Sequence, residues 1–152
     1  ITLVGAGHLA AWLSGFMAER SLSALIMKTN ASVGLIATGV SLLLLTSGKP
    51  GTGRRAAAQA LAVLSTLLGS LTLIENLTGW DLGIDQLVAT EPHGALGTFG
   101  ANRMGMPGSS SFLLAGLSLL HLSRPGERNA RRSQVFALGI CLIALTFISR
   151  RR

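Results

Sequence analysis

The chain has 152 residues, of which 49% are hydrophobic and only 12% charged, and its formal net charge is +7. Soluble domains carry about 25% charged residues, so this composition argues against a water-soluble globule. The basic residues flank apolar runs, tyrosine is absent and aromatic residues make up 5%, which argues against a nucleic-acid-binding surface with stacking platforms.

Apolar runs separated by charged segments dominate the chain. About 20 residues cross the roughly 30 Å hydrocarbon core of a bilayer, and a charge at its centre costs about 2.5–3.5 kcal/mol. The pattern therefore predicts an all-α, polytopic transmembrane helix bundle that forms one integral membrane domain over residues 1–152. The predicted spans are about 1–18, 30–46, 55–74, 107–122 and 132–149.

The connections between these spans differ in charge. The loops at 48–55 and 123–132 fall on one side and hold seven Lys/Arg, whereas the connections at 19–28 and 75–106 hold three. The positive-inside rule places the first pair and the N-terminus of a multi-pass chain in the cytoplasm. The arginines at 150–152 would then fall outside, a conflict that a sixth span beyond them would reduce.

Part of the chain recurs at an offset of 77 residues. The register continues from one apolar run through the basic loop into the next, which predicts a duplicated helical hairpin. Small residues let membrane helices approach closely, so we expect the repeated ones on helix-packing faces. The matched pairs are Ser32 and Ser109, Gly39 and Gly116, Ser41 and Ser118, and Arg54-Arg55 and Arg131-Arg132.

The extramembrane segment 75–106 carries a net charge of −3. Its first part predicts a short surface helix or an ordered loop, and Trp80 suits a membrane interface. On a helix Asp81 and Asp85 would share one face; as loop acids they would pair with Arg103 or be solvated. Trp80, Asp81, Asp85 and Arg103 are the candidate extramembrane interaction residues, and residues 88–102 are glycine-rich and predicted irregular.

Histidines are the only candidate cofactor ligands. Imidazole readily takes an axial position on haem or a chlorophyll-type metal, and the five-span topology puts both His8 and His121 toward the basic-loop side. Neither lies in a motif that specifies a cofactor, so we predict none and expect hydrogen-bonded or interfacial histidines. His93 beside Glu91 lacks zinc-ligand spacing, and we expect Cys141 to be a small packed hydrophobe.

Two features resemble a known family. Met27 and Met104 each open a Met-x-x-Asn/Pro-x-Ser sequence before a leucine-rich helix, and the linker 75–87 leads to Asn102-Arg103-Met104. These resemble the N-terminal membrane region of bacterial sensor proteins, in which a multi-helix module precedes PAS, histidine-kinase or diguanylate-cyclase domains. The resemblance covers most of residues 20–150, is most specific over 79–87 and departs at 105–108. It implies the multi-pass topology, the bacterial inner (cytoplasmic) membrane and a role in signal input, with no binding residues to carry over.

Three functional hypotheses follow. The chain is a non-catalytic signal-input module, or an accessory or scaffold subunit of a larger respiratory or photosynthetic membrane complex, packed against other membrane chains or its own copies. A small transporter would need polar mid-membrane residues and broken helices, for which residues 105–108 are the one hint. Nothing supplies a nucleophile with a base and an orienting group, so the sequence does not predict an enzyme.

Overall fold

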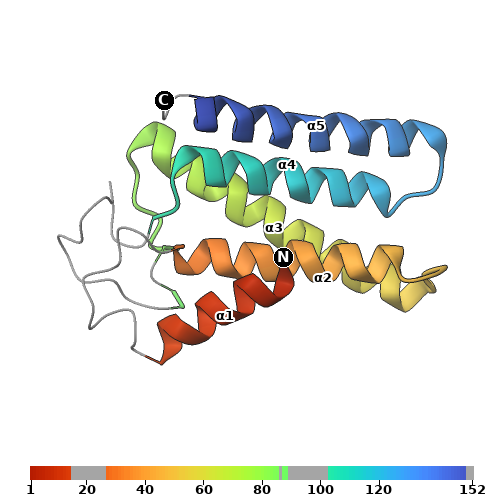
Figure 1. Cartoon of the computed structure of the whole chain (residues 1–152), viewed down its shortest axis with the longest axis horizontal. Coiled ribbons are helices and arrows are strands. Elements are labelled where there is room, and N and C mark those ends of the chain that lie inside the picture. The colour runs from red at the N-terminus through yellow and green to blue at the C-terminus, as the bar shows by residue number, and fades with distance from the viewer. Residues whose placement is uncertain (15–26, 86, 89–102, 150–152) are drawn as a thin grey trace.

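A computed structural model describes residues 1–14, 27–85, 87–88 and 103–149, and this part of the chain folds as an all-helical bundle (Figure 1). The all-α prediction is confirmed. The helices are α1 (Thr2–Leu13), α2 (Thr29–Thr46), α3 (Thr52–Thr78), α4 (Met106–Leu122) and α5 (Glu127–Ser149). The predictions for residues 15–26, for 89–102 with Glu91 and His93, and for 150–152 lie outside the described residues.

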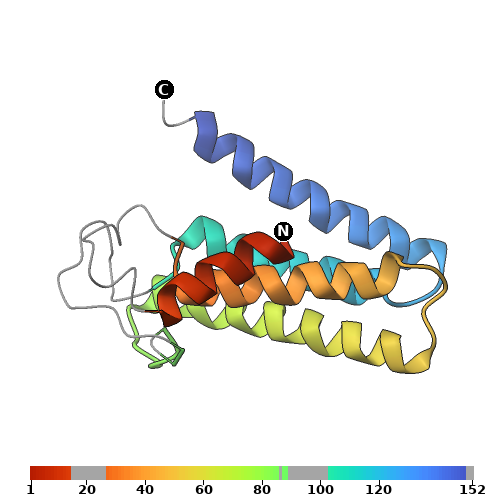
Figure 2. The ribbon, with the colours of Figure 1, turned by 60° about the horizontal axis from the view of Figure 1, so that its bottom comes forward.

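Helices α2, α3 and α4 pack against one another and form the centre of the bundle. Of the described helices, α1 packs only on α2 and α5 packs only on α4, and the most extensive contact joins α3 to α4. Consecutive helices α2 and α3, and α4 and α5, form two antiparallel hairpins (Figure 1). In Figure 2, α5 leaves the rest of the bundle progressively toward its C-terminal end. The bundle therefore has a central trio with one helix attached on each side.

The distribution of side chains is that of a membrane protein. Buried positions are mostly small or hydroxylic, whereas large apolar side chains face outward, such as Leu138 at 64% and Leu142 at 65% exposure. Helices α2, α3 and α5 are long and apolar enough to cross a membrane, and α1 and α4 are shorter apolar helices. Lipid offers no hydrophobic drive to bury leucine between helices, so small residues take the contact positions instead. The protein is accordingly suited to a lipid bilayer.

One face of α3 shows how the centre packs. Its buried residues recur every three or four positions: Ala58, Ala62, Ser65, Gly69, Thr72 and Glu75. A Cβ on Gly69 would lie 2.7 Å from the carbonyl oxygen of Ser109, and the Ser65 hydroxyl donates to the carbonyl of Phe112 at 3.2 Å. These side chains bring the backbones of α3 and α4 into direct contact.

The four predicted packing residues also lie at contacts between helices. A Cβ on Gly39 would lie 3.1 Å from the backbone nitrogen of Thr2 in α1, and one on Gly116 would lie 2.7 Å from the carbonyl oxygen of Ala62 in α3. The Ser41 hydroxyl donates to the carbonyl of Ala58 at 2.8 Å. The Ser118 hydroxyl donates to the carbonyl of Ser133 at 2.9 Å, across the second hairpin. The duplication itself stays a prediction from the sequence.

Several helix boundaries differ from those expected. Helix α3 extends beyond 55–74 at both ends, because Gly51 is its N-cap and Gly79, at φ +74°, ends it in the left-handed conformation that suits glycine. Helix α5 begins at Glu127 instead of 132, directly after Gly126 at φ +114°. An acidic residue in the first turn stabilises a helix N-terminus. Both corrections come from short turns that leave more residues to the helices.

One expectation about burial is wrong. Cys141 is exposed, because α5 packs against α4 alone and leaves most of its circumference uncovered.

Candidate functional site

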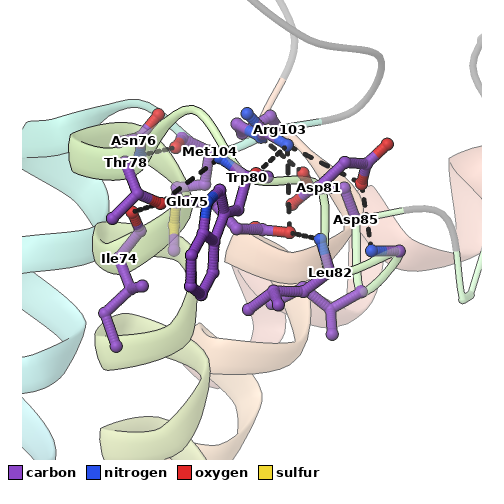
Figure 3. Close-up of polar contacts among 12 residues, drawn as sticks. Ile74, Glu75, Asn76, Thr78, Trp80, Asp81, Leu82, Asp85, Arg103 and Met104 are labelled. Atoms are coloured by element: carbon purple, nitrogen blue, oxygen red, sulfur yellow. Dashed lines mark hydrogen bonds and ion pairs between the residues drawn. The ribbon is translucent and has the colours of Figure 1, made fainter.

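Polar side chains gather at the end of the bundle where α2 begins, α3 ends and α4 begins (Figure 3). We call this cluster the polar cap and define it as Asn30, Glu75, Asn76, Asp81, Asp85 and Arg103. Asn30 lies in the first turn of α2, and Glu75 and Asn76 lie in the last turn of α3. The two aspartates lie in the loop after α3, and Arg103 precedes α4.

Arg103 is the centre of the polar cap. Its Nε donates to Asp85 Oδ2 at 2.8 Å and its Nη2 donates to the Trp80 carbonyl at 3.2 Å. Nη2 also lies 3.8 Å from Glu75 Oε1 and 3.7 Å from Asp81 Oδ1. The hydrogen bond to Asp85 raises the pKa of the guanidinium, burial opposes the rise, and the three carboxylates add to it. Arg103 therefore stays charged and joins the loop to the end of α3.

Glu75 is the most deeply buried charged residue of the cap, with no exposed surface. Its Oε1 accepts a hydrogen bond from the Leu82 N–H at 2.8 Å, which fixes the loop against α3. Its Oε2 is buried without a hydrogen-bond partner, as is Oγ1 of Thr72 on the same face one turn earlier. Buried polar atoms are usually hydrogen-bonded, so the cap is an incompletely satisfied network.

The loop after α3 is ordered by its own turns and is not helical. Gly83, at φ +68°, donates its N–H to Asp81 Oδ1 at 3.0 Å. The Trp80 N–H donates to the Thr78 hydroxyl at 3.3 Å. Asp81 and Asp85 do not share a helix face; both turn toward Arg103 instead. Of the two conformations expected for this segment, the ordered loop is the one observed.

Two asparagines extend the cap to the neighbouring helices. Asn30 Nδ2 donates to the Ile84 carbonyl at 3.2 Å and to Asp85 Oδ1 at 3.4 Å. Asn76 Nδ2 donates to the Met104 carbonyl at 3.0 Å, just before α4. Hydrogen bonds thus connect the beginning of α2, the end of α3 and the approach to α4.

The outer rim of the cap is accessible. Trp80 is 66% exposed, and the Asp81 side chain is 81% exposed. Three carboxylates face one guanidinium, so the cap holds an excess of negative charge. It can fasten three helix ends together and offer an aromatic ring and a carboxylate to the outside.

The two candidate cofactor histidines lie far apart. Thr2 packs on Gly39 and Gly5 packs on Ser32, so α1 runs toward the start of α2 and carries His8 to the polar-cap end. The expectation that His8 lies toward the basic loops is wrong, since α1 enters the bundle beside the middle of α2.

Each histidine has a local environment of its own. Nδ1 of His8 lies 3.0 Å from the Val4 carbonyl oxygen, a hydrogen bond within α1. His121 stacks on Phe136 with ring centroids 5.7 Å apart. Helices α1 and α4 are not in contact, so the pair does not converge on one cofactor. In the described part of the chain, no group of three His, Cys, Asp or Glu side chains could hold a metal ion.

Sequence reasoning found four residues of this region, namely Trp80, Asp81, Asp85 and Arg103. It did not predict that Glu75 is fully buried or that Asn30 and Asn76 connect the cap to the neighbouring helices. The available signal was weak. Glu75 is the first charge after a long apolar run, and each asparagine is an amide beside the end of a span. Such positions are ordinary for polar residues, so the sequence alone did not distinguish them.

Comparison of the chain with protein-family models, with curated proteins and with solved structures gives no match. The resemblance to bacterial sensors therefore stays a prediction, and the functional argument rests on the geometry of the bundle.

Proposed function

We propose that this chain is a non-catalytic integral membrane module of the bacterial inner membrane that serves as the signal-input region of a sensor. The observation that supports this most is the position of Arg103. Its guanidinium contacts the Glu75 carboxylate at the end of α3, and two carboxylates and a carbonyl of the loop that follows. A change in charge or binding at the exposed rim would alter contacts that hold α2, α3 and α4 together.

The contacts of Arg103 support a polar cap in which this guanidinium can pair with more than one carboxylate. It makes one short hydrogen bond to Asp85, while its separations from Glu75 and Asp81 are 3.8 and 3.7 Å. Glu75 keeps an unpartnered oxygen nearby. A guanidinium with several carboxylates in reach can exchange partners without leaving the cluster, which is the property a bistable element needs.

Helix α3 provides a rigid connection to the other end of the bundle. Its 27 residues form one uninterrupted helix of about 40 Å. At its first turn, Arg54 Nη2 donates to the carbonyls of Leu44 and Ser47, which fastens α3 to the end of α2. Rigid elements joined by polar contacts at both ends are a physical route for coupling.

The test measures whether the cap controls the far end of the bundle. Spin labels on cysteines introduced at Thr46 and Leu122 report the distance between α2 and α4 there, in a Cys141→Ser background reconstituted in vesicles. We expect Arg103→Gln to shift or broaden the distance distribution. Arg128→Gln is the matched control, because this exposed arginine at the start of α5 lies outside the cap and should leave the distribution unchanged.

The same measurement separates the second candidate, an accessory subunit of a larger membrane complex. That alternative is favoured by α5, in which Ser133 is the only buried residue and whose leucines face outward. A scaffold would lose cap contacts in Arg103→Gln, seen as faster amide exchange in the loop, with the far-end distance unchanged. That combination would reject signal input.

The structure gives the transporter hypothesis no new support. Helix α4 is continuous from Met106, with Pro107 in its first turn, where its missing N–H costs nothing. Residues 105–108, the one hint of a broken helix, are therefore an ordinary helix start.

A further inference from the structure

A groove of about 410 Å³ runs along the bundle between α2, α4 and α5. Its walls include Leu35, Leu42, Phe112, Ala115, Ala137 and Ile140. Ligand pockets measure about 300–1,000 Å³, so its size is sufficient for a small guest. It lies away from the polar cap and has no part in the function proposed above.

The groove lies beside the side of α5 that α4 leaves uncovered. Helix α5 packs on α4, whereas no backbone contact joins α2 to α5, and α5 diverges along its length (Figure 2). Ser118 donates to the Ser133 carbonyl and holds α5 close at the floor of the groove. Ile1 also lines the space.

The groove offers an occupant almost nothing but hydrocarbon. The hydroxyls along its lining already donate to backbone carbonyls: Thr38 to Gly34 at 2.8 Å and Ser111 to Pro107 at 2.7 Å. Ser118 is engaged with Ser133 in the same way. Apolar cavities stay free of water and bind apolar guests. The occupant must therefore be apolar along the length that enters.

The bilayer itself supplies an apolar guest of suitable length. Leu35 and Leu42, seven residues apart in α2, line the groove over about 10 Å. A single hydrocarbon chain can lie along that length.

One end of the groove opens toward basic residues. Leu42 and Leu119 line it about one turn before α2 and α4 end. Beyond them lie the loops with the seven Lys/Arg, which we call the basic end. Arg128 and Arg131, with Glu127 beside them, line a surface hollow at the start of α5. Basic residues at a membrane surface attract anionic lipid by about 1 kcal/mol each.

We propose that this groove binds one acyl chain of an anionic phospholipid, whose phosphate lies against the basic end. The hydrocarbon chain fills the space that α5 leaves beside α2, and the headgroup meets the positive charges at the membrane surface. The bound lipid would replace the missing contact between α2 and α5.

The test measures, by mass, the lipid that stays bound to the intact chain. The protein is reconstituted in vesicles of equal phosphatidylglycerol and phosphatidylcholine, extracted with mild detergent and measured by native mass spectrometry. We expect one retained phosphatidylglycerol per chain. Ala115→Phe and Ala137→Phe fill the groove from α4 and from α5 and should lower retention at least fivefold. Leu138→Phe, on the outward face of α5, is the matched control and should retain lipid like the wild type.

A second arm tests the headgroup. The double variant Arg128→Gln, Arg131→Gln should keep a lipid but lose the preference for phosphatidylglycerol over phosphatidylcholine. Circular dichroism shows which variants are folded. Because the Ala137 side chain is exposed, we expect Ala137→Phe to fold even if Ala115→Phe does not. A wild-type chain that retains no lipid, or both lipids equally, would overturn the proposal. So would folded Ala137→Phe with undiminished retention, or a wild-type dimer without lipid.

Discussion

At the scale of single residues, the contacts between helices depend on side chains that are small or absent. Gly69 and Gly116 let backbone atoms of α3 and α4 approach to distances that a methyl group would not allow. Leucines instead face outward, where lipid solvates them as well as another helix would. Stability at this scale comes from close backbone approach and from hydroxyls that donate to carbonyls of the next helix.

Gly116→Ala should destabilise the bundle by about 1–3 kcal/mol, the usual cost of overpacking. The added Cβ would lie 2.6 Å from the Thr66 nitrogen and 2.7 Å from the Ala62 carbonyl oxygen, and backbone atoms cannot move aside singly. The measurement is reversible unfolding in mixed micelles, followed by circular dichroism. Gly7→Ala is the control, since a Cβ there meets nothing within 4 Å. Equal stability of the two variants would contradict the packing described here.

At the scale of elements, the two hairpins differ in how firmly their second helix is held. Helix α3 packs against α2 and α4, whereas α5 packs against α4 alone. The bond from Ser118 to the Ser133 carbonyl therefore carries a larger share of the attachment of α5 than the bond from Ser41 to Ala58 carries for α3. Its unpacked circumference makes α5 the element whose position depends most on lipid or on another chain.

Ser118→Ala should loosen α5. Hydrogen bonds between membrane helices contribute about 0.6 kcal/mol on average, which corresponds to roughly threefold faster opening. Hydrogen–deuterium exchange of α5 amides in vesicles would show the change. Thr146→Ala serves as the control, because its hydroxyl donates only within α5, to the Leu142 carbonyl at 2.8 Å. Exchange that is unchanged in Ser118→Ala, or equally accelerated in both variants, would show that this bond does not hold α5.

At the scale of the whole molecule, the bundle has two chemically different ends. The polar cap contains three carboxylates and one arginine, with Lys28 at the nearby start of α2. The opposite end contains seven Lys/Arg and one acidic residue, Glu127. The helices between them present apolar side chains outward. This distribution supports an orientation in which the basic end lies in the cytoplasm.

Single cysteines introduced at Lys49 and Gly83 should be modified by a membrane-impermeant thiol reagent from opposite sides of the membrane. We expect Lys49→Cys to react only after intact bacterial cells are permeabilised, and Gly83→Cys to react beforehand, both in a Cys141→Ser background. Reaction of both from the same side would reject a bundle that crosses the membrane between these ends. The reverse order would reject the orientation alone.

The sequence by itself determined that the protein is helical and suited to a membrane, where the apolar helices lie and which small residues meet at contacts. These features depend on the solvent and on local propensity, both of which act on each segment separately. The ends of α3 and α5 were placed several residues short, because turn geometry at Gly51, Gly79 and Gly126 decides them and several turns were sterically possible.

Only the tertiary structure decided which polar residues meet. Arg103 reaches Glu75 across 28 positions, and Asn30 reaches the loop across more than 50. It also decided that α1 carries His8 to the polar-cap end and that α5 leaves a groove beside α2. The physical reason is that the packed faces of these helices carry small and hydroxylic residues, whereas their outer faces carry leucines. This pattern indicates which face of a helix packs but not which helix it packs against, so close packing selects the partners.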